Sequence, residues 1–581
     1  MAAVYSFLIY PAIYFVGLVL RSIGIDLAGY YEFAGSGLIA IWTLLALRLI
    51  FKAKFNGFRA SYKRILLALL PFIVFIGVIV IARDYGSIIS TDILVHKTVL
   101  NGMSDPQTVG FMPASYSSTF TDQAYPIVMF HAFLYTLANA FKFDYALAGY
   151  FVDIFLTLIF SIAAYKLFRK YYKPGWAVLG VTLSLLVFEN LAYTAHFFIP
   201  QTFAFLLFLF ILGDKDLKFR GLIAAIGILL LTHFFIGIFL SFFLIVKYIY
   251  YERVIKVESK KQNLLLFQEI ILVFLFIISL SITGFSIENS FQKGITDWVG
   301  GLSNPDFRGK FDAILALIGA GWLVLIPAFL RVFFKPHKTM PELIGYFGMM
   351  TTIAIYFLAP TFAGKFLLGF GLFSSLVVIA FLQKLKPKHL LVYVVIGILL
   401  ITSYGVNYVL QLQTLTSFIL QNNGPTSAVV KKDNNLVKYW QENSPKCVLI
   451  SDPQTQLTIH SLGEGESLRG NYMNLGDRNT FVEFIGSPNA DTLEKVKNLT
   501  DLSDPRYAGK PLCIGITARL MELATKDHRW TKMIFTYQVD HTDRLNKQVE
   551  VIRFLDKNAN EIYNDDYHAV FLLSLNKDSN E

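Results

Sequence analysis

Charged residues are scarce in this chain: Asp, Glu, Lys and Arg make up only 16% of its 581 residues. Hydrophobic residues account for 55%, and the mean hydropathy is +0.53. This composition argues against a large soluble globule and predicts a membrane protein, because many apolar runs reach the ~20 residues that a helix needs to cross a bilayer. The net charge of +10 comes from short basic clusters between these runs, which favours topology signals over nucleic-acid binding.

Cysteine is almost absent, with only Cys447 and Cys513 in the chain. Neither belongs to a CxxC motif, and no His/Cys spacing typical of a metal site occurs. Both lie in predicted strands of a domain expected outside the cytoplasm, where a disulfide is permitted. Two buried thiols on neighbouring strands are an equally acceptable interpretation, so the sequence leaves this pairing open.

Placing the basic clusters on the cytoplasmic side predicts an α-helical polytopic protein of the cytoplasmic membrane with about 13 transmembrane helices. The N-terminus then lies inside and the C-terminus outside. Residues 1–411 form the membrane domain, residues 83–144 its first large outer loop, and the short apolar stretch 126–140 a helix on the outer membrane surface. The predicted spans are residues 2–20, 35–51, 65–82, 145–167, 174–193, 199–213, 220–234, 235–250, 264–284, 311–334, 342–359, 362–383 and 390–411.

Beyond Gln411 the composition changes, and short apolar runs alternate with polar helical stretches. Residues 425–581 are therefore predicted to form an extracytoplasmic α/β domain. The predicted strands are residues 446–450, 512–516, 533–537, 549–554 and 569–575. The predicted helices are residues 436–442, 454–461 and 491–499.

The first outer loop contains the most informative polar residues, Asp84, Asp92 and His96. Asp92 and His96 are four positions apart, so they share one face of any helix formed there. A carboxylate beside an imidazole can supply a general base, or ligands for a metal. The alternative is a solvated loop helix that Asp92 caps at its N-terminus.

A series of motifs resembles the GT-C class of polytopic glycosyltransferases. The D-x-x-x-H of Asp92–His96 is followed by Y-P-I-V-M-F-H at Tyr125–His131 and a short interfacial helix. Later segments are similar to the outer-end motifs of these enzymes. They are E-N-L-A-Y-T-A-H-F-F-I-P-Q-T at Glu189–Thr202, L-T-H-F-F-I-G at Leu231–Gly237 and P-T-F-A-G-K at Pro360–Lys365.

The resemblance implies a glycosyltransferase, acting with inversion, that moves a sugar from a polyprenyl-phosphate or diphosphate carrier to a glycan, lipid or protein acceptor on the outer face. It gives the general base role to Asp92, with Asp84 as the competitor. His96 would orient the carboxylate or contact the phosphate. No nucleic acid is implied as a partner.

The resemblance also implies a site for the departing phosphate and for the acceptor. The phosphate or carrier candidates are Lys365, Arg308 and His131. Lys365 stands at a position where the class more often has arginine. The alternative role for Arg308 is that of an ordinary interfacial side chain, and the alternative for His131 is that of a polar anchor at the interface. The substrate-binding candidates are Asp153, Glu189, His196 and His233. For Asp153 and His233, a hydrogen-bonded packing role between helices is the alternative.

The chain departs from the better-known enzymes of this class. It has no W-W-D-Y-G-like sequence after residue 411, which argues against an asparagine-linked oligosaccharyltransferase. Mg²⁺ or Mn²⁺ would suit carboxylates at a lipid-diphosphate site, but no ligand set is identifiable. Three other functions stay open: a surface-polysaccharide polymerase or ligase, a secondary transporter or lipid flippase in which Asp153 couples ions, and a non-catalytic assembly protein.

Overall fold

The computed structural model describes just over half of the chain. Before residue 41 it describes isolated positions only. The described ranges after that are 66–77, 96–97, 100–101, 129–141, 149–187, 199–213, 219–250, 314–315, 318–335, 339–358, 367–385, 390–422, 433–463, 465–468, 475–503, 507, 509–517, 541–565 and 567–573. The predicted spans at 2–20, 35–51 and 264–284 therefore lie largely or wholly outside the described residues, as does the predicted strand at 533–537.

The chain divides into two compact units. The helical unit comprises Met1–Arg83 and Ile127–Thr414, and the C-terminal unit comprises Asp84–Pro126 and Leu415–Glu581. The segment that carries Asp84, Asp92 and His96 is thus grouped with the end of the chain. The two units are described separately below.

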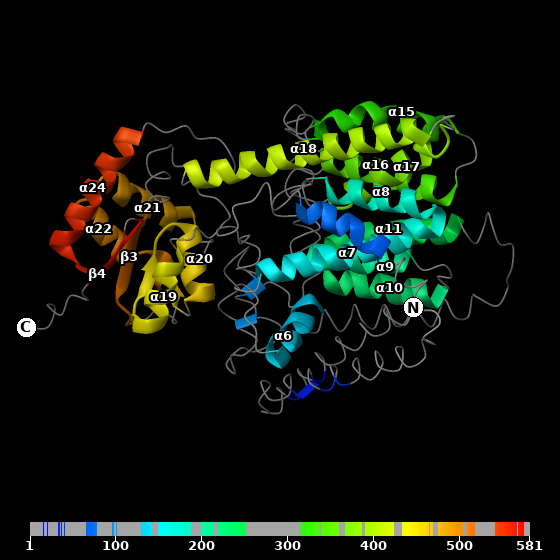
Figure 1. Ribbon diagram of the computed structural model, residues 1–581. Coiled ribbons are helices and arrows are strands. Elements are labelled where there is room, and N and C mark those ends of the chain that lie inside the picture. The colour runs from blue at the N-terminus through cyan, green and yellow to red at the C-terminus, as the bar shows by residue number, and fades with distance from the viewer. Residues whose placement is uncertain are drawn as a thin grey trace, which may run out of the picture. The chain divides into compact units, whose positions relative to one another are not determined.

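The helical unit consists of α-helices that run alongside one another (Figure 1). They are α6 (Met129–Phe141), α7 (Gly149–Tyr171), α8 (Pro174–Leu185), α9 (Pro200–Leu212), α10 (Phe219–Thr232), α11 (Phe234–Tyr250), α15 (Trp322–Phe334), α16 (Met340–Leu358) and α17 (Phe370–Leu382). The long helix α18 (Leu390–Asn422) begins in this unit. The predicted break in the apolar run 220–250 is confirmed, because α10 ends at Thr232 and α11 begins at Phe234.

The core of the helical unit lies around α9 and α17, in which nearly every residue is buried. Aromatic rings join the helices, with Phe373 stacked on Phe243 at a centroid distance of 5.2 Å. Glycine allows α16 to approach α17 closely, since a Cβ atom at Gly348 would lie 2.3 Å from the ring of Phe373. A helix that is apolar on all sides, as α9 and α17 are, must bury its whole circumference.

The prediction of about 13 transmembrane helices is wrong for the described part of the chain. Among the described helices, none is both long and apolar enough to cross a membrane. The predicted integral-membrane location, with the N-terminus inside and the C-terminal domain outside, is therefore not supported and is withdrawn. Several apolar runs taken as spans form helices of 12 to 17 residues, shorter than the ~20 required. Their apolar side chains pack against neighbouring helices, as those of α9 and α17 do.

The C-terminal unit contains a five-stranded sheet in the order β2-β1-β3-β5-β4. The strands are β1 (Val448–Ile450), β2 (Glu466–Ser467), β3 (Leu512–Thr517), β4 (Asn560–Asn564) and β5 (His568–Leu572). β1 pairs in parallel with β2 and β3, whereas β5 is antiparallel to β3 and β4. The helices are α19 (Asp433–Asn443), α20 (Pro453–Leu462), α21 (Leu475–Gly486), α22 (Ala490–Lys497) and α24 (His541–Asn558).

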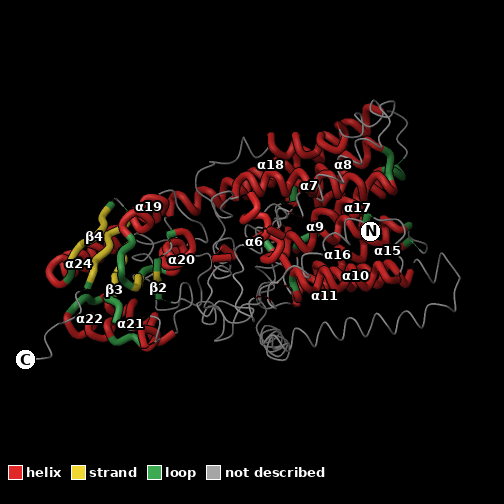
Figure 2. Tube along the Cα trace, turned by 90° about the horizontal axis from the view of Figure 1, so that it is seen from below, coloured by secondary structure: helices red, strands yellow, loops and turns green. Residues whose placement is uncertain are grey.

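The two faces of this sheet have different coverings (Figure 2). Alternate strand residues such as Ile450, Ile514 and Phe571 belong to a core shared with buried residues of α21, α22 and α24. The intervening residues, among them Ser451, Cys513, Thr517 and His568, point to the opposite face because side chains alternate along a strand. Figure 2 shows α19 and α20 on the side away from α21 and α22.

One predicted strand of this unit is a helix. Residues 549–554 lie within α24, where Val551 and Leu555 are fully buried and Val549 is exposed. Buried side chains that are four residues apart fit the period of a helix, whereas a strand would bury every second residue. The charged residues between these positions face outward. The predicted helices at 436–442, 454–461 and 491–499 correspond to α19, α20 and α22, and three predicted strands to β1, β3 and β5. The sequence did not predict β2, β4 or α21.

A disulfide joins Cys447 to Cys513, with a Cα–Cα distance of 5.7 Å. The sequence left open whether these two cysteines form a disulfide or remain buried thiols, and the structure shows the disulfide. Cys513 lies in β3, and Cys447 immediately precedes β1, its parallel neighbour. The bond therefore fastens two strands whose cysteines are 66 residues apart in sequence.

Replacing both cysteines with alanine is expected to lower the free energy of unfolding of the full chain by about 2 to 4 kcal/mol. The upper value is what the chain-entropy relation gives for a closed loop of this length. Urea denaturation checks it, and wild-type protein with reductant should match the double variant. A wild-type transition that does not respond to reductant would contradict the expectation.

Candidate functional site

Of the three residues predicted to act as base and its partner, only His96 is among the described residues; Asp84 and Asp92 lie outside them. Residues 96, 97, 100 and 101 are helical. The His96 side chain is buried, with 3% of its surface exposed. An imidazole removed from solvent in this way can orient a neighbouring group through a hydrogen bond, as the predicted role requires.

Of the predicted phosphate contacts, His131 is described, whereas Lys365 and Arg308 are not. His131 lies in α6 and is fully buried, 5.5 Å from the ring of Phe130. Burial lowers its pKa from 6.5 to about 3. His131 is therefore neutral near pH 7, and it can offer a phosphate a hydrogen bond but no positive charge.

Among the predicted substrate contacts, Glu189 and His196 lie outside the described residues, and Asp153 lies within α7. His233 is half-buried between α10 and α11, where its Nδ1 atom accepts a hydrogen bond from the Ile236 amide at 3.3 Å. This ring thus caps the first turn of α11. α6, which carries His131, packs against α10, which ends next to His233.

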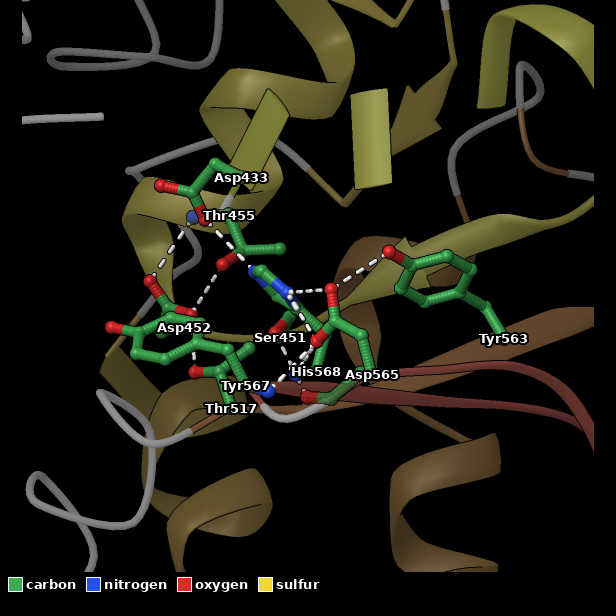
Figure 3. Close-up of polar contacts among 10 residues, drawn as sticks. Asp433, Ser451, Asp452, Thr455, Thr517, Tyr563, Asp565, Tyr567 and His568 are labelled. Atoms are coloured by element: carbon green, nitrogen blue, oxygen red, sulfur yellow. Dashed lines mark hydrogen bonds and ion pairs between the residues drawn. The ribbon is translucent and has the colours of Figure 1, made fainter. Parts of the chain in front are cut away.

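A second polar constellation, which the sequence did not single out, centres on His568 in the C-terminal unit (Figure 3). Its Nε2 atom lies 2.8 Å from Oδ1 of Asp433, and both side chains are almost completely buried. Its Nδ1 atom lies 3.2 Å from Oδ1 of Asp565. The ring thus bridges two carboxylates, one at the start of α19 and one in the turn between β4 and β5.

Asp565 forms several hydrogen bonds besides its contact with His568. It accepts hydrogen bonds of 2.7 Å from the Tyr563 hydroxyl and from the backbone amides of Tyr567 and His568. Burial alone would raise the pKa of Asp565, but the bonds from His568, Tyr563 and the backbone outweigh it and hold that pKa well below the usual range. For Tyr563, burial and the adjacent carboxylate together raise the pKa of the hydroxyl.

A third carboxylate, Asp452, lies where β1 ends and α20 begins. Its Oδ1 atom accepts from the Thr455 amide at 3.0 Å, and its Oδ2 atom accepts from the hydroxyls of Thr455 and Thr517 at 2.6 and 2.7 Å. Thr517 pairs with His568 across β3 and β5, which brings this group next to the His568 network (Figure 3). Asp452 is the N-cap of α20.

These polar groups gather at the carboxyl ends of β1 and β3, where the strand order reverses and α/β sheets commonly bind ligands. Protein groups form hydrogen bonds with each of these carboxylates, so the arrangement is a clamp that links β3, β5 and α19. Among the described residues, no group of three or more His, Cys, Asp or Glu side chains could hold a metal ion. The sequence signal for the clamp was the D-D-Y-H segment before β5.

Solved structures to which this chain is similar include two from Archaeoglobus fulgidus. One is the oligosaccharyltransferase of Archaeoglobus fulgidus in the apo form, with 11% identity and a TM-score of 0.49 over 80% of this chain and 71% of that one. Another is the archaeal oligosaccharyltransferase AglB from the same organism in complex with an inhibitory peptide and a dolichol-phosphate, with 12% identity and a TM-score of 0.49 over 80% of this chain and 70% of that one. No protein-family model matches the chain. No curated protein matches it either.

Proposed function

We propose that this protein is a glycosyltransferase that moves a sugar from a polyprenyl-phosphate or diphosphate carrier to an acceptor. The observation that carries the proposal is the pair of motifs D-x-x-x-H at residues 92–96 and Y-P-x-x-x-F-H at residues 125–131. Both histidines of these motifs, His96 and His131, are buried. A solvated loop with incidental histidines would leave these rings in water, so the burial of each ring within its own unit supports a defined role for it.

In the proposed reaction, the Asp92 carboxylate accepts the proton of the acceptor nucleophile as the latter attacks the anomeric carbon of the sugar. The bond between that carbon and the carrier phosphate breaks, and the phosphate oxygen takes the electron pair. A positioned carboxylate accelerates such a step by about 10² to 10⁴-fold. His96, four positions further along the sequence, orients the carboxylate, and Asp84 is the alternative base.

The departing phosphate gains negative charge and needs donors fixed in advance. Lys365 and Arg308 are the proposed cationic contacts, with a lysine acting as a point charge rather than as a bidentate fork. His131 is assigned a neutral hydrogen-bonding role, because burial keeps its imidazole uncharged. The proposed substrate-binding residues are Asp153, Glu189, His196 and His233.

The test is an assay of the purified full chain with labelled polyprenyl-phosphate and polyprenyl-diphosphate sugars. A panel of lipid, glycan and peptide acceptors is supplied, with and without Mg²⁺, Mn²⁺ and EDTA. We expect transfer of the sugar with release of an equal amount of carrier phosphate, and inversion at the anomeric carbon. A ladder of products from one acceptor would identify a polymerase. Carrier binding with no covalent product from any donor would refute glycosyl transfer.

A further inference from the structure

The C-terminal end of α20 is completed by side chains from elsewhere in the chain. The last carbonyl groups of any helix lack partners within it. The Leu462 carbonyl accepts a hydrogen bond from Nε2 of Gln441 in α19 at 2.8 Å. The Ser461 carbonyl accepts one from Nδ2 of Asn101 at 3.0 Å, although the two residues are 360 positions apart. Asn101 therefore acts as a C-cap donated by the segment that follows Asp92 and His96.

The helix that receives this bond is firmly held. At its first turn, Asp452 bonds Thr455 and Thr517, which ties α20 to β3. In its middle, Nε2 of Gln456 donates to the Leu468 carbonyl at 2.8 Å. At its end, the Ile459 carbonyl accepts from the amides of Gly463 and Gly465 at 3.0 and 3.1 Å. A group that hydrogen-bonds to the Ser461 carbonyl is therefore attached to a helix that is itself held in place by the rest of the domain.

The segment that donates the bond has a buried face of its own. His96 and Leu100 are 3% and 5% exposed, and residues four apart in a helix lie on the same side. Asn101 is the next residue after Leu100, and Asp92 precedes His96 by four positions in the sequence. Burial and one directed hydrogen bond together fix both the depth and the rotation of this segment.

We infer that the C-terminal domain positions the segment of the proposed base, and that Asn101 is the positioning residue through which it does so. This inference rests on the proposed glycosyl transfer and assigns the α/β domain a part in it. Asn101 itself contacts no substrate. Its amide holds the helical residues 96, 97, 100 and 101 against the end of α20, and thereby fixes His96, which follows Asp92 by four positions in the sequence.

The test compares Asn101→Ala and Asn101→Asp with the matched control Gln441→Ala. The aspartate has the shape of asparagine but places an oxygen instead of an N–H donor against the Ser461 carbonyl. The control removes the neighbouring capping bond on Leu462 without touching the loop segment. Two measurements are made on the full chain: hydrogen exchange of the amides of residues 96–101, and kcat and KM for the labelled polyprenyl-linked sugar.

We expect both Asn101 variants to raise exchange of residues 96–101 and to lower kcat about tenfold, the equivalent of one hydrogen bond, with the donor KM unchanged. Asn101→Gln, which keeps an amide donor, should recover part of the rate. Gln441→Ala should leave kcat and the exchange of 96–101 as in the wild type.

The outcomes separate the two proposals. Wild-type protein that shows no transfer would overturn the proposed function and the positioning role with it. Wild-type transfer with an equal kcat in Asn101→Ala would overturn the positioning role alone. An equal loss of kcat in Gln441→Ala would also overturn it, because the effect would then come from general loosening of α20.

Discussion

Asp92→Asn is expected to lower kcat for sugar transfer by about 10² to 10⁴-fold while leaving the affinity for the carrier-linked donor nearly unchanged. The amide is almost isosteric with the carboxylate, so the segment should keep its conformation. It cannot accept a proton near neutral pH, however, and the attacking group of the acceptor would have to lose its proton to water. Steady-state kinetics with the labelled donor, together with direct measurement of donor binding, check both parts of this expectation.

Asp84→Asn is the matched control, because it makes the same chemical change eight residues earlier in the same segment. It should lower kcat by less than about tenfold, since a carboxylate near the site but not in contact with the reacting proton contributes only electrostatically. A large loss in Asp84→Asn with normal turnover in Asp92→Asn would move the base role to Asp84. Normal turnover in both variants would eliminate a carboxylate base from this segment.

The sequence could propose Asp92 and His96 because their spacing is local, whereas the bonded networks of the C-terminal unit depend on distant partners. His568 and Asp433 are separated by 135 residues, and Asn101 and Ser461 by 360. Only the register of β5 against β3, and the start of α19, bring the first pair together. The D-D-Y-H run at residues 565–568 contains His568 but gives no sign of the distant Asp433, and Asn101 belongs to no short motif.

The fold shows a comparable division between local and non-local information. Helix limits in the C-terminal unit followed local signals, as with Pro453 at the start of α20 and the 3.6-residue periodicity of α22. The apolar runs of the helical unit did not reveal their surroundings. A helix such as α17, apolar on every side, has the same composition whether lipid or protein surrounds it, and here its residues are packed against other helices.

His568→Ala is expected to destabilise the C-terminal unit by about 1.5 to 3 kcal/mol, the usual contribution of a hydrogen bond to a charged group, here the Asp565 carboxylate. The ring joins Asp433, which is almost fully buried, to Asp565, so its loss would remove this bond from the Asp433 carboxylate. The start of α19 and the β4–β5 turn would then lose their common attachment. Native-state hydrogen exchange of amides in β3 and β5, measured on the full chain, reports the free energy of opening of this sheet.

His460→Ala provides the matched control, since Nδ1 of this half-buried histidine of α20 lies 3.3 Å from a neutral group, the Gly465 carbonyl. It should cost about 1 kcal/mol, as for an ordinary hydrogen bond. A second signature is the pH dependence. The depressed pKa of Asp565 gives stability that is fully present above the unfolded value of about 3.9 and is lost as the pH falls through the folded value. His568 supplies the first of the bonds that lower this pKa, so the stability difference between wild type and His568→Ala should shrink below about pH 4. A difference that stays constant into acid, or an equal loss in His460→Ala, would mean that His568 acts through packing and not through its bonds to the two carboxylates.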